Sequence, residues 1–180
     1  MTLDISHLSL KTRIGDIWLA GSQKGIFCVN FGEIDVDSVE GFFRGRPGVT
    51  FRQGGRMVEQ AGREILLFLE GKQKKPSVKL DLTGTTVFAR KVWRATRKIP
   101  YGEVRTYAWV AEKLGYPNSA RAVGGALGSN PVPIFIPCHR VIACDGHLGG
   151  FSGGVTIKKL LLALESGQSS LGLGLYETEE

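Results

Sequence analysis

The 180-residue chain contains little cysteine and no long hydrophobic run. Its three cysteines, Cys28, Cys138 and Cys144, lack the even number and regular spacing of a disulfide framework. No stretch of about 18 apolar residues is present, so no membrane span is predicted. The first residues, MTLDISHLSLKTR, lack the basic start and apolar core of a secretory signal. We therefore expect a cytoplasmic protein (nuclear if the source is eukaryotic) with no membrane partner.

Candidate metal ligands are few and poorly spaced. The one dense group follows the pattern C-H-x4-C-x2-H and comprises Cys138, His139, Cys144 and His147. This spacing differs from the usual zinc patterns, and adjacent side chains on a strand point apart. The N-terminal part offers no acid pair, metal cluster or phosphate-binding loop. We predict no metal and no cofactor.

Positive charge is concentrated in one segment. Between Gly84 and Arg140 the chain carries nine Lys or Arg residues and two acidic residues, a net charge of +7. The remainder carries 14 basic and 15 acidic residues, a net charge of −1. A segment of this kind suits contact with a polyanion. A basic face that is merely solvated is the alternative.

The first part of the chain is predicted to combine strands with one helix. Residues 1–31 contain β-prone runs separated by the turn-like sequence GSQKG. Residues 56–70 carry apolar side chains at helical spacing, and Gly71 follows them. The sequence KQKKP then predicts an exposed connector. We expect a scaffold domain over residues 1–80.

The second part, residues 81–166, is predicted to be mainly helical. An amphipathic helix begins in the sequence TTVFARKVW. Thr106 is a suitable N-cap for the next helix and Gly115 a suitable C-terminal stop. After the turn YPN, Asn118 or Ser119 can cap a further helix. Helix, tight turn and helix within the basic segment predict a helix-turn-helix.

The last of these helices is rich in small residues. Its sequence, ARAVGGALGSN, contains three glycines and three alanines, and each interior glycine costs about 1 kcal/mol relative to alanine. A smooth helix surface permits either tight helix–helix packing or entry into a narrow nucleic-acid groove. Arg121 is its only long basic side chain. Alone it would be an ordinary surface charge, but among small residues on a basic domain it suggests a side chain that probes the nucleic acid.

Cys138 is the candidate nucleophile. It lies in the strand-like run IPCHRV, next to His139 and before the glycine-rich loop CDGHLGGFSGG. A free thiol is only a few per cent thiolate at neutral pH, and a nearby base and positive charge raise that fraction. On a strand the two neighbours point apart, so we expect His139 to act through a bridging water. An inert buried thiol is the alternative.

The histidine would in turn need an orienting acid. The sequence TIKKLLLALE places Ile157, Leu160, Leu161 and Leu164 on one face of a predicted helix. Glu165 lies at the edge of that face, where its side chain could turn inward. A surface acid at a helix end is the alternative.

Together these residues carry a family resemblance. The sequence RAVGGALGSNPVPIFIPCHRVIACDGHLGGFSGG closely resembles the methylated-DNA–protein-cysteine methyltransferases (O6-alkylguanine-DNA alkyltransferases), with similarity from about Val87 to Glu165. The resemblance implies an α+β (α/β) fold, in which a small RNase H-like sheet-plus-helix domain precedes a mainly helical domain with a winged helix-turn-helix. It also implies a monomer without a cofactor.

The activity implied by the resemblance is direct-reversal DNA repair. An alkyl group on O6 of guanine, and also on O4 of thymine, would pass to Cys138 in a single turnover. The damaged nucleotide in double-stranded DNA would first be flipped out of the helix, which costs a few kcal/mol. A thioether is a very poor leaving group, so the thiol would not be regenerated. A non-enzymatic helix-turn-helix regulator or damage sensor is the alternative, against which the presence of Cys138 counts.

The resemblance implies three groups of site residues. The catalytic group would be Cys138, His139, Glu165 and Tyr107, with Tyr107 helping to rotate the nucleotide and donating a proton to the leaving guanine. The DNA-contacting group in the minor groove would be Tyr107, Arg121, Ala122, Gly124 and Gly125, with Arg121 filling the vacated place in the stack. The base pocket would be Asn130, Val141, Phe151, Ser152 and Gly153.

Finer roles follow from the same resemblance. Asn130 would structure the turn between the recognition helix and the active site. The carbonyls of Cys138 and Val141 would read the guanine amino group, and Ser152 and Gly153 would donate to O6. Arg140 would be a structural ion-pair partner.

The sequence also departs from common relatives. Phe151 stands where tyrosine is frequent, and Leu164 replaces a histidine that often precedes the glutamate. The residues that bind structural zinc in some relatives are absent, with only Cys28 and His7 nearby. The tail, residues 167–180, has no counterpart from which a role could be assigned.

Overall fold

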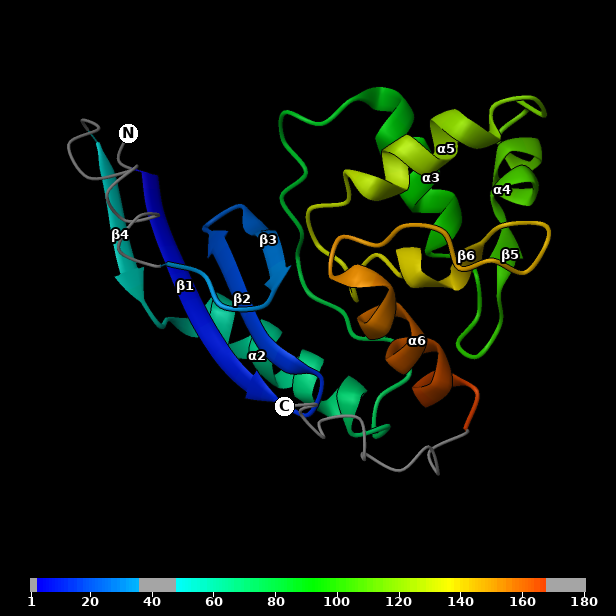
Figure 1. Ribbon diagram of the computed structural model, residues 1–180. Helices are drawn as coiled ribbons and strands as arrows, with labels where there is room; N and C mark the ends of the chain where they lie inside the picture. Colours follow the sequence, from blue (N-terminus) through cyan, green and yellow to red (C-terminus); the bar gives the residue numbers. More distant parts are fainter. Residues whose placement is uncertain (1–2, 36–47, 168–180) are drawn as a thin grey trace.

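The computed structural model describes residues 3–35 and 48–167, which form a mixed sheet with one helix and then a mainly helical part (Figure 1). The strands are β1 (Leu3–Thr12), β2 (Gly15–Ser22), β3 (Gly25–Phe31) and β4 (Val49–Gln53), in the order β3-β2-β1-β4. β2 pairs antiparallel with β1 and with β3, whereas β4 pairs parallel with β1. The predicted α+β order is confirmed.

Helix α2 (Arg56–Leu69) packs on the sheet, because apolar residues recur along one of its sides. The buried positions are Val58, Ala61, Gly62, Ile65, Phe68 and Leu69. Gly62 permits close approach to β1, since a Cβ there would lie 2.9 Å from a methyl group of Leu8. Gly71 adopts a φ of 74° just after the helix, as the sequence predicts for a helix stop.

The second part contains four helices and a two-stranded parallel sheet among the described residues. They are α3 (Val87–Thr96), α4 (Tyr107–Lys113), α5 (Ala120–Gly128), α6 (Gly154–Glu165), β5 (Arg105–Thr106) and β6 (Val141–Ile142). Thr106 Oγ1 accepts a hydrogen bond from Trp109 N at 3.1 Å, and Gly115 follows α4 with a φ of 79°. Both predicted ends are confirmed, and α4 and α5 form the helix-turn-helix pair.

The predicted strand around Cys138 is wrong. Cys138–Arg140 form the 3-10 turn η1, in which Arg140 N donates to Pro137 O at 3.0 Å. Proline has no N–H to donate to a ladder, which disfavours a strand here. Before this turn the chain reverses at Ile134, whose φ of 74° is unusual for a β-branched residue. Only residues 141–142 pair with β5.

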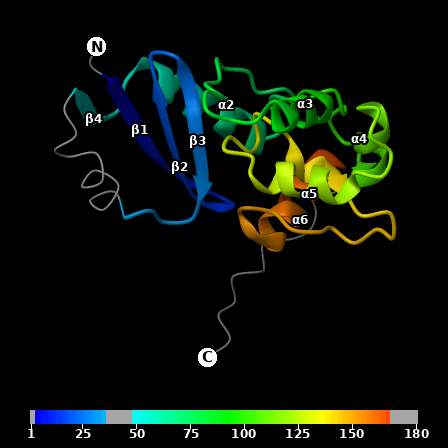
Figure 2. The ribbon, with the colours of Figure 1, turned by 90° about the horizontal axis from the view of Figure 1, so that it is seen from above.

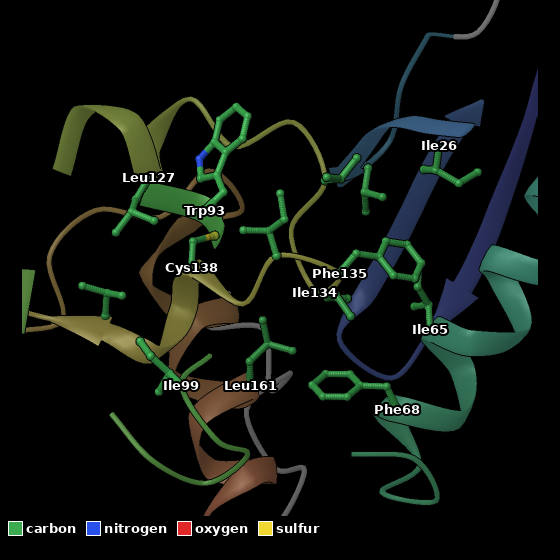
Figure 3. Close-up of a cluster of buried hydrophobic side chains, with 14 of the residues drawn as sticks. Ile26, Ile65, Phe68, Trp93, Ile99, Leu127, Ile134, Phe135, Cys138 and Leu161 are labelled. Atoms are coloured by element: carbon green, nitrogen blue, oxygen red, sulfur yellow. The ribbon is translucent and has the colours of Figure 1, made fainter. Parts of the chain in front are cut away.

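The two parts of the chain share one hydrophobic core. Figures 1 and 2 show the sheet and the helices α3 to α6 side by side. In Figure 3, Ile65 and Phe68 of α2 point toward Phe135 and Leu161 from the second part, and Cys138 lies in the same cluster. Main-chain hydrogen bonds also cross, including Val29 N to Pro131 O at 2.8 Å. The segment that carries Cys138 is therefore anchored from both sides.

Two further sequence predictions concern membrane spans and the C-terminal tail. Among the described helices, none is long and apolar enough to cross a membrane. The predicted tail, residues 167–180, lies outside the described residues except for Gly167.

Candidate active site

Cys138 is held at the end of a turn that Asn130 organises. Asn130 Nδ2 donates to Ile136 O and to Cys138 Sγ, each at 3.0 Å, and its Oδ1 accepts from Val132 N at 3.1 Å. Asn130 follows Ser129, the C-cap of α5, so one side chain links the end of α5 to the thiol. Cys138 itself is only 5% exposed.

The sulfur is protonated in the resting protein. Burial raises the pKa of Cys138 to about 11, although the hydrogen bond from Asn130 and the positive charge of Lys158 both lower it. A nearby base and positive charge were expected to raise the thiolate fraction, but in the free protein burial outweighs the nearby donors. A reaction at Cys138 requires a base to remove the proton.

His139 is the histidine that follows Cys138 in the chain. The imidazole is fully buried, and its Nε2 lies 2.8 Å from Glu165 Oε1. Burial lowers the pKa of His139, so the ring is neutral at neutral pH. Its single proton belongs on Nε2, which faces a carboxylate, and this leaves a lone pair on Nδ1. Nδ1 is buried and has no hydrogen-bond partner among the residues that the structure describes.

Glu165 is the buried acid of the site. Burial acts to raise the pKa of its carboxyl, but hydrogen bonds from His139 and Arg140 hold that pKa below its ordinary value. Arg140 Nε and Nη2 each lie 2.8 Å from a carboxylate oxygen, and Gly102 N donates to Oε2 at 3.0 Å. Arg140 Nη1 also donates to Ile99 O at 2.7 Å. The carboxylate is thus fixed, and its charge is balanced by Arg140.

A hollow of about 500 Å³ opens between the helix-turn-helix and the glycine loop, residues 143–153. It is lined by Tyr107, Ala108, Ala120, Arg121, Gly124, Ala143, Cys144, Gly149 and Gly150. Burial and the nearby Cys138 raise the pKa of Tyr107, which keeps its hydroxyl protonated at neutral pH. The structure therefore gathers Tyr107, Arg121 and Gly124 at one opening.

The outer surface of α5 is smooth. Arg121, Ala122, Gly125, Gly128 and Ser129 are exposed, and among them only Arg121 is long. A Cβ on Gly125 would meet nothing within 4 Å, whereas a Cβ on Gly124 would lie 3.8 Å from the Tyr107 ring. Gly124 therefore faces the tyrosine, and the other small residues form an open surface.

The residues predicted to form a base pocket are divided between two places. Asn130 contacts the sulfur, and the carbonyl of Val141 accepts a hydrogen bond from Lys158 Nζ at 2.7 Å. Phe151 packs against Phe31 of β3, and the two ring centroids are 5.5 Å apart. A Cβ on Gly153 would lie 2.4 Å from the Phe31 ring. Ser152, between them, is exposed. None of these side chains lines the hollow.

Sequence reasoning missed Lys158. The buried positions of α6 are Lys158, Leu161 and Glu165, so the buried face is turned slightly from the expected apolar stripe. The spacing of Lys158, Leu161 and Glu165 (i, i+3, i+7) could have revealed the buried lysine, because it places both charged residues on the face of Leu161.

For metal ions, no group of three or more potential ligands (His, Cys, Asp or Glu) is gathered in residues 3–35 and 48–167.

Comparison with known proteins assigns the class. Residues 87–167 match the family model described as 6-O-methylguanine DNA methyltransferase, DNA binding domain. The chain is 39% identical over 154 residues to a methylated-DNA–protein-cysteine methyltransferase of Methanosarcina acetivorans, covering 84% of this chain and 92% of the relative. An inducible enzyme of the same name from Bacillus subtilis is 38% identical over 156 residues, covering 86% and 87%.

Solved structures agree with the sequence comparisons. The crystal structure of Mycobacterium tuberculosis OGT in complex with DNA superposes with a TM-score of 0.76 at 34% identity, covering 91% of this chain and 94% of that one. The fold and site define a DNA-binding protein with an alkyl-accepting cysteine. The chain belongs to the methylated-DNA–protein-cysteine methyltransferase family. It repairs O6-methylguanine in DNA by alkyl transfer to a cysteine, so the non-enzymatic alternative is set aside.

Proposed function

We propose that Cys138 is the acceptor, and that it takes one alkyl group from O6-alkylguanine, or from O4-alkylthymine, in double-stranded DNA. The observation that carries this assignment is the environment of buried His139, the residue after the buried Cys138: Glu165 holds its Nε2, and its Nδ1 has no hydrogen-bond partner among the described residues. Cys28 and Cys144 are also free thiols, but neither precedes a histidine in the sequence. Because no group of the site can remove the alkyl group from the thioether sulfur, each molecule reacts once.

The chemistry follows from these positions. His139 Nδ1 accepts the Cys138 proton through a water, while Glu165 holds the ring and stabilises the imidazolium. The sulfur forms a bond to the alkyl carbon as the carbon–O6 bond breaks, and that electron pair stays on the guanine. Tyr107 donates a proton to the base and takes up a proton from solvent. His139 then releases to solvent the proton that it accepted from Cys138. In sum, the alkyl group replaces the thiol proton and guanine gains one proton.

Nucleotide flipping in the minor groove is the proposed route to the sulfur. The minor groove is about 6 Å wide, so the helix that enters it needs small side chains. Support comes from the exposed face of α5, where Ala122 and Gly125 add little bulk beside Arg121. Arg121 also lines the hollow next to Tyr107, which suits a side chain that replaces an extruded base.

For the extruded base we propose a pocket formed by Asn130, Val141, Phe151, Ser152 and Gly153. The Val141 carbonyl accepts one hydrogen bond from Lys158 and has a second lone pair for the guanine amino group. Phe151 provides an apolar wall. Ser152 is exposed and lies just before α6, where its hydroxyl and the main chain of Gly153 can donate to O6.

We also propose the organisation of the protein. Residues 81–166 form the DNA-binding and alkyltransferase domain, in agreement with the matched residues 87–167, and residues 1–80 form a scaffold domain. The protein acts as a monomer, in the cytoplasm or in a eukaryotic nucleus. Three free thiols are consistent with such a reducing compartment.

The test is stoichiometric. Protein mixed with an excess of duplex that contains O6-methylguanine should remove one methyl group per molecule and then stop. Cys138→Ala should bind the duplex and remove none, whereas Cys144→Ala, which removes the exposed thiol of the hollow, should remain active. Continued turnover, or full activity of Cys138→Ala, would refute the assignment.

A further inference from the structure

Phe31, the last residue of β3, connects the N-terminal sheet to the end of the glycine loop. Its ring packs against the ring of Phe151, with the centroids 5.5 Å apart and the planes inclined by 45°. A Cβ built on Gly153 would lie 2.4 Å from Cδ2 and 2.8 Å from Cγ of Phe31. Figures 1 and 2 show the end of β3 beside the start of α6. One side chain of the sheet therefore lies against two residues of the proposed base pocket.

The stretch from Gly149 to Thr156 has little other support. Phe151 and Gly153 are partly buried, whereas the other residues of this stretch are exposed. The two partly buried residues are thus the two that meet Phe31. A surface segment with so few buried contacts moves easily unless those contacts hold it. We therefore attribute the position of this stretch mainly to the Phe31 ring.

The fit between Phe31 and Gly153 is steric. Gly153 has a φ of −86° and a ψ of 7°, a conformation that is open to residues with a Cβ. A Cβ is excluded instead by the Phe31 ring, which it would overlap at 2.4 Å. A milder conflict arises with Phe151, whose Cε1 would lie 3.1 Å away. The large ring of Phe31 thus fills the space that the absent side chain of Gly153 leaves.

The same strand also holds the opposite side of the proposed pocket. Val29 N, two residues before Phe31, donates to Pro131 O at 2.8 Å. Pro131 follows Asn130, whose Nδ2 lies 3.0 Å from Cys138 Sγ. β3 therefore contacts both the segment that leads to the acceptor sulfur and the loop that provides the apolar wall. A strand that touches both sides fixes the space between them.

We propose that Phe31 is a positioning residue that sets the size of the alkyl group accepted by the site. This role rests on the base pocket proposed above. By holding Phe151 and Gly153, the ring defines the room between the wall and the sulfur of Cys138. Without the ring the wall can move away from the sulfur, which admits a larger alkyl group and gives a methyl group no advantage. A small change of fit in an apolar pocket alters discrimination by about 10- to 200-fold.

The first test is the ratio of benzyl to methyl transfer, measured with two duplexes that contain O6-benzylguanine or O6-methylguanine. Phe31→Ala should raise this ratio about tenfold. The matched control is Phe27→Ala, which removes the same ring from β3 where it packs against the separate cluster of Ile5, Trp18 and Ala20. The control should leave the ratio unchanged, because a general loss of stability slows both transfers equally. A ratio in Phe31→Ala equal to that of the control would overturn the proposal.

The second test is a double-mutant cycle between Phe31 and Gly153. Gly153→Ala alone should slow methyl transfer about tenfold, because the added methyl group overlaps the ring and displaces the loop. In the Phe31→Ala background the same change should cost little, because the ring is gone. The two losses are then far from additive, as expected for residues in direct contact. Additive losses would show that the contact does not position the loop.

Phe31→Leu covers the case in which Phe31→Ala does not fold, as urea denaturation would reveal. It keeps an apolar side chain but removes the ring, so the benzyl-to-methyl ratio should rise in the same direction by a smaller factor. An unchanged ratio in Phe31→Leu would then refute the proposal. If wild-type Cys138 accepts no alkyl group from either duplex, the proposed function fails instead, so the two failures are distinguishable.

Discussion

A comparison of Gly149→Ala with a control variant separates the effect of backbone strain from the effect of displacing Tyr107. Gly149 has a φ of 68°, which costs a residue with a Cβ about 1–2 kcal/mol. A Cβ built at this position would lie 2.6 Å from Tyr107 Oη and 3.3 Å from Cε2 and Cζ of the same ring. The ring end or the loop must therefore move, and Tyr107 is the proposed proton donor to the leaving base.

Gly146→Ala is the matched control, from the same loop. Gly146 has a φ of 85°, so it carries a similar backbone cost, but a Cβ there would meet nothing within 4 Å. Both variants should lose about 1–2 kcal/mol of unfolding free energy. Only Gly149→Ala should also slow alkyl transfer, by about 10- to 100-fold, because a reacting group displaced by about 1 Å loses much of its effect.

The assay is single-turnover transfer from a duplex containing O6-methylguanine, with protein in excess. Urea denaturation of each variant measures its unfolding free energy separately. Equal transfer rates for the two variants at equal stability would refute the reasoning, because Tyr107 would then tolerate displacement. Loss of duplex binding in Gly149→Ala without a change in rate once bound would also contradict it.

Three further predictions concern the other site residues. Arg121→Ala should slow transfer from duplex DNA more than transfer from free O6-alkylguanine base, because only the duplex has a vacated place to fill; equal losses would contradict this role. Glu165→Gln leaves the Arg140 charge buried without a partner and should lower the unfolding free energy by about 3–5 kcal/mol in urea denaturation, whereas an unchanged value would show that the pair is dispensable. His139 and Glu165 both have folded-state pKa values below their ordinary 6.5 and 4.5. At acidic pH the unfolded state therefore binds more protons than the folded state, so the unfolding free energy should fall as the pH drops below 6.5 and fall further below 4.5. Urea denaturation from pH 4 to 8 measures this, and an unfolding free energy that rises as the pH falls would contradict the prediction.

The parts of the fold that depend on local signals could be predicted from the sequence. Thr106 and Gly115 define the ends of α4, because a cap hydroxyl and a positive φ are requirements of the chain itself. The strand predicted at Cys138 failed because an apolar run bounded by prolines resembles a buried strand by composition. The conformation of this segment depends on the Asn130 side chain, which forms hydrogen bonds with the main chain of Val132 and Ile136.

The protonation state of Cys138 depends on tertiary contacts that no local pattern contains. The pKa of Cys138 depends on how much protein surrounds the sulfur, and burial outweighs the hydrogen bond from Asn130 and the charge of Lys158. Lys158 was overlooked because a lysine in an amphipathic helix is normally solvated. The partner that explains its burial is the main chain of Val141, which lies 17 residues away.

The most direct test of the central claim uses a duplex whose O6-methylguanine carries a deuterated methyl group. After reaction, peptide mass spectrometry locates the label. Cys144 is a strong competitor, because it is exposed and lines the hollow, whereas Cys138 is buried. We predict one deuterated methyl group on Cys138 and none on Cys144 or Cys28. Label on Cys144, or repair of the duplex with Cys138 unmodified, would contradict the account.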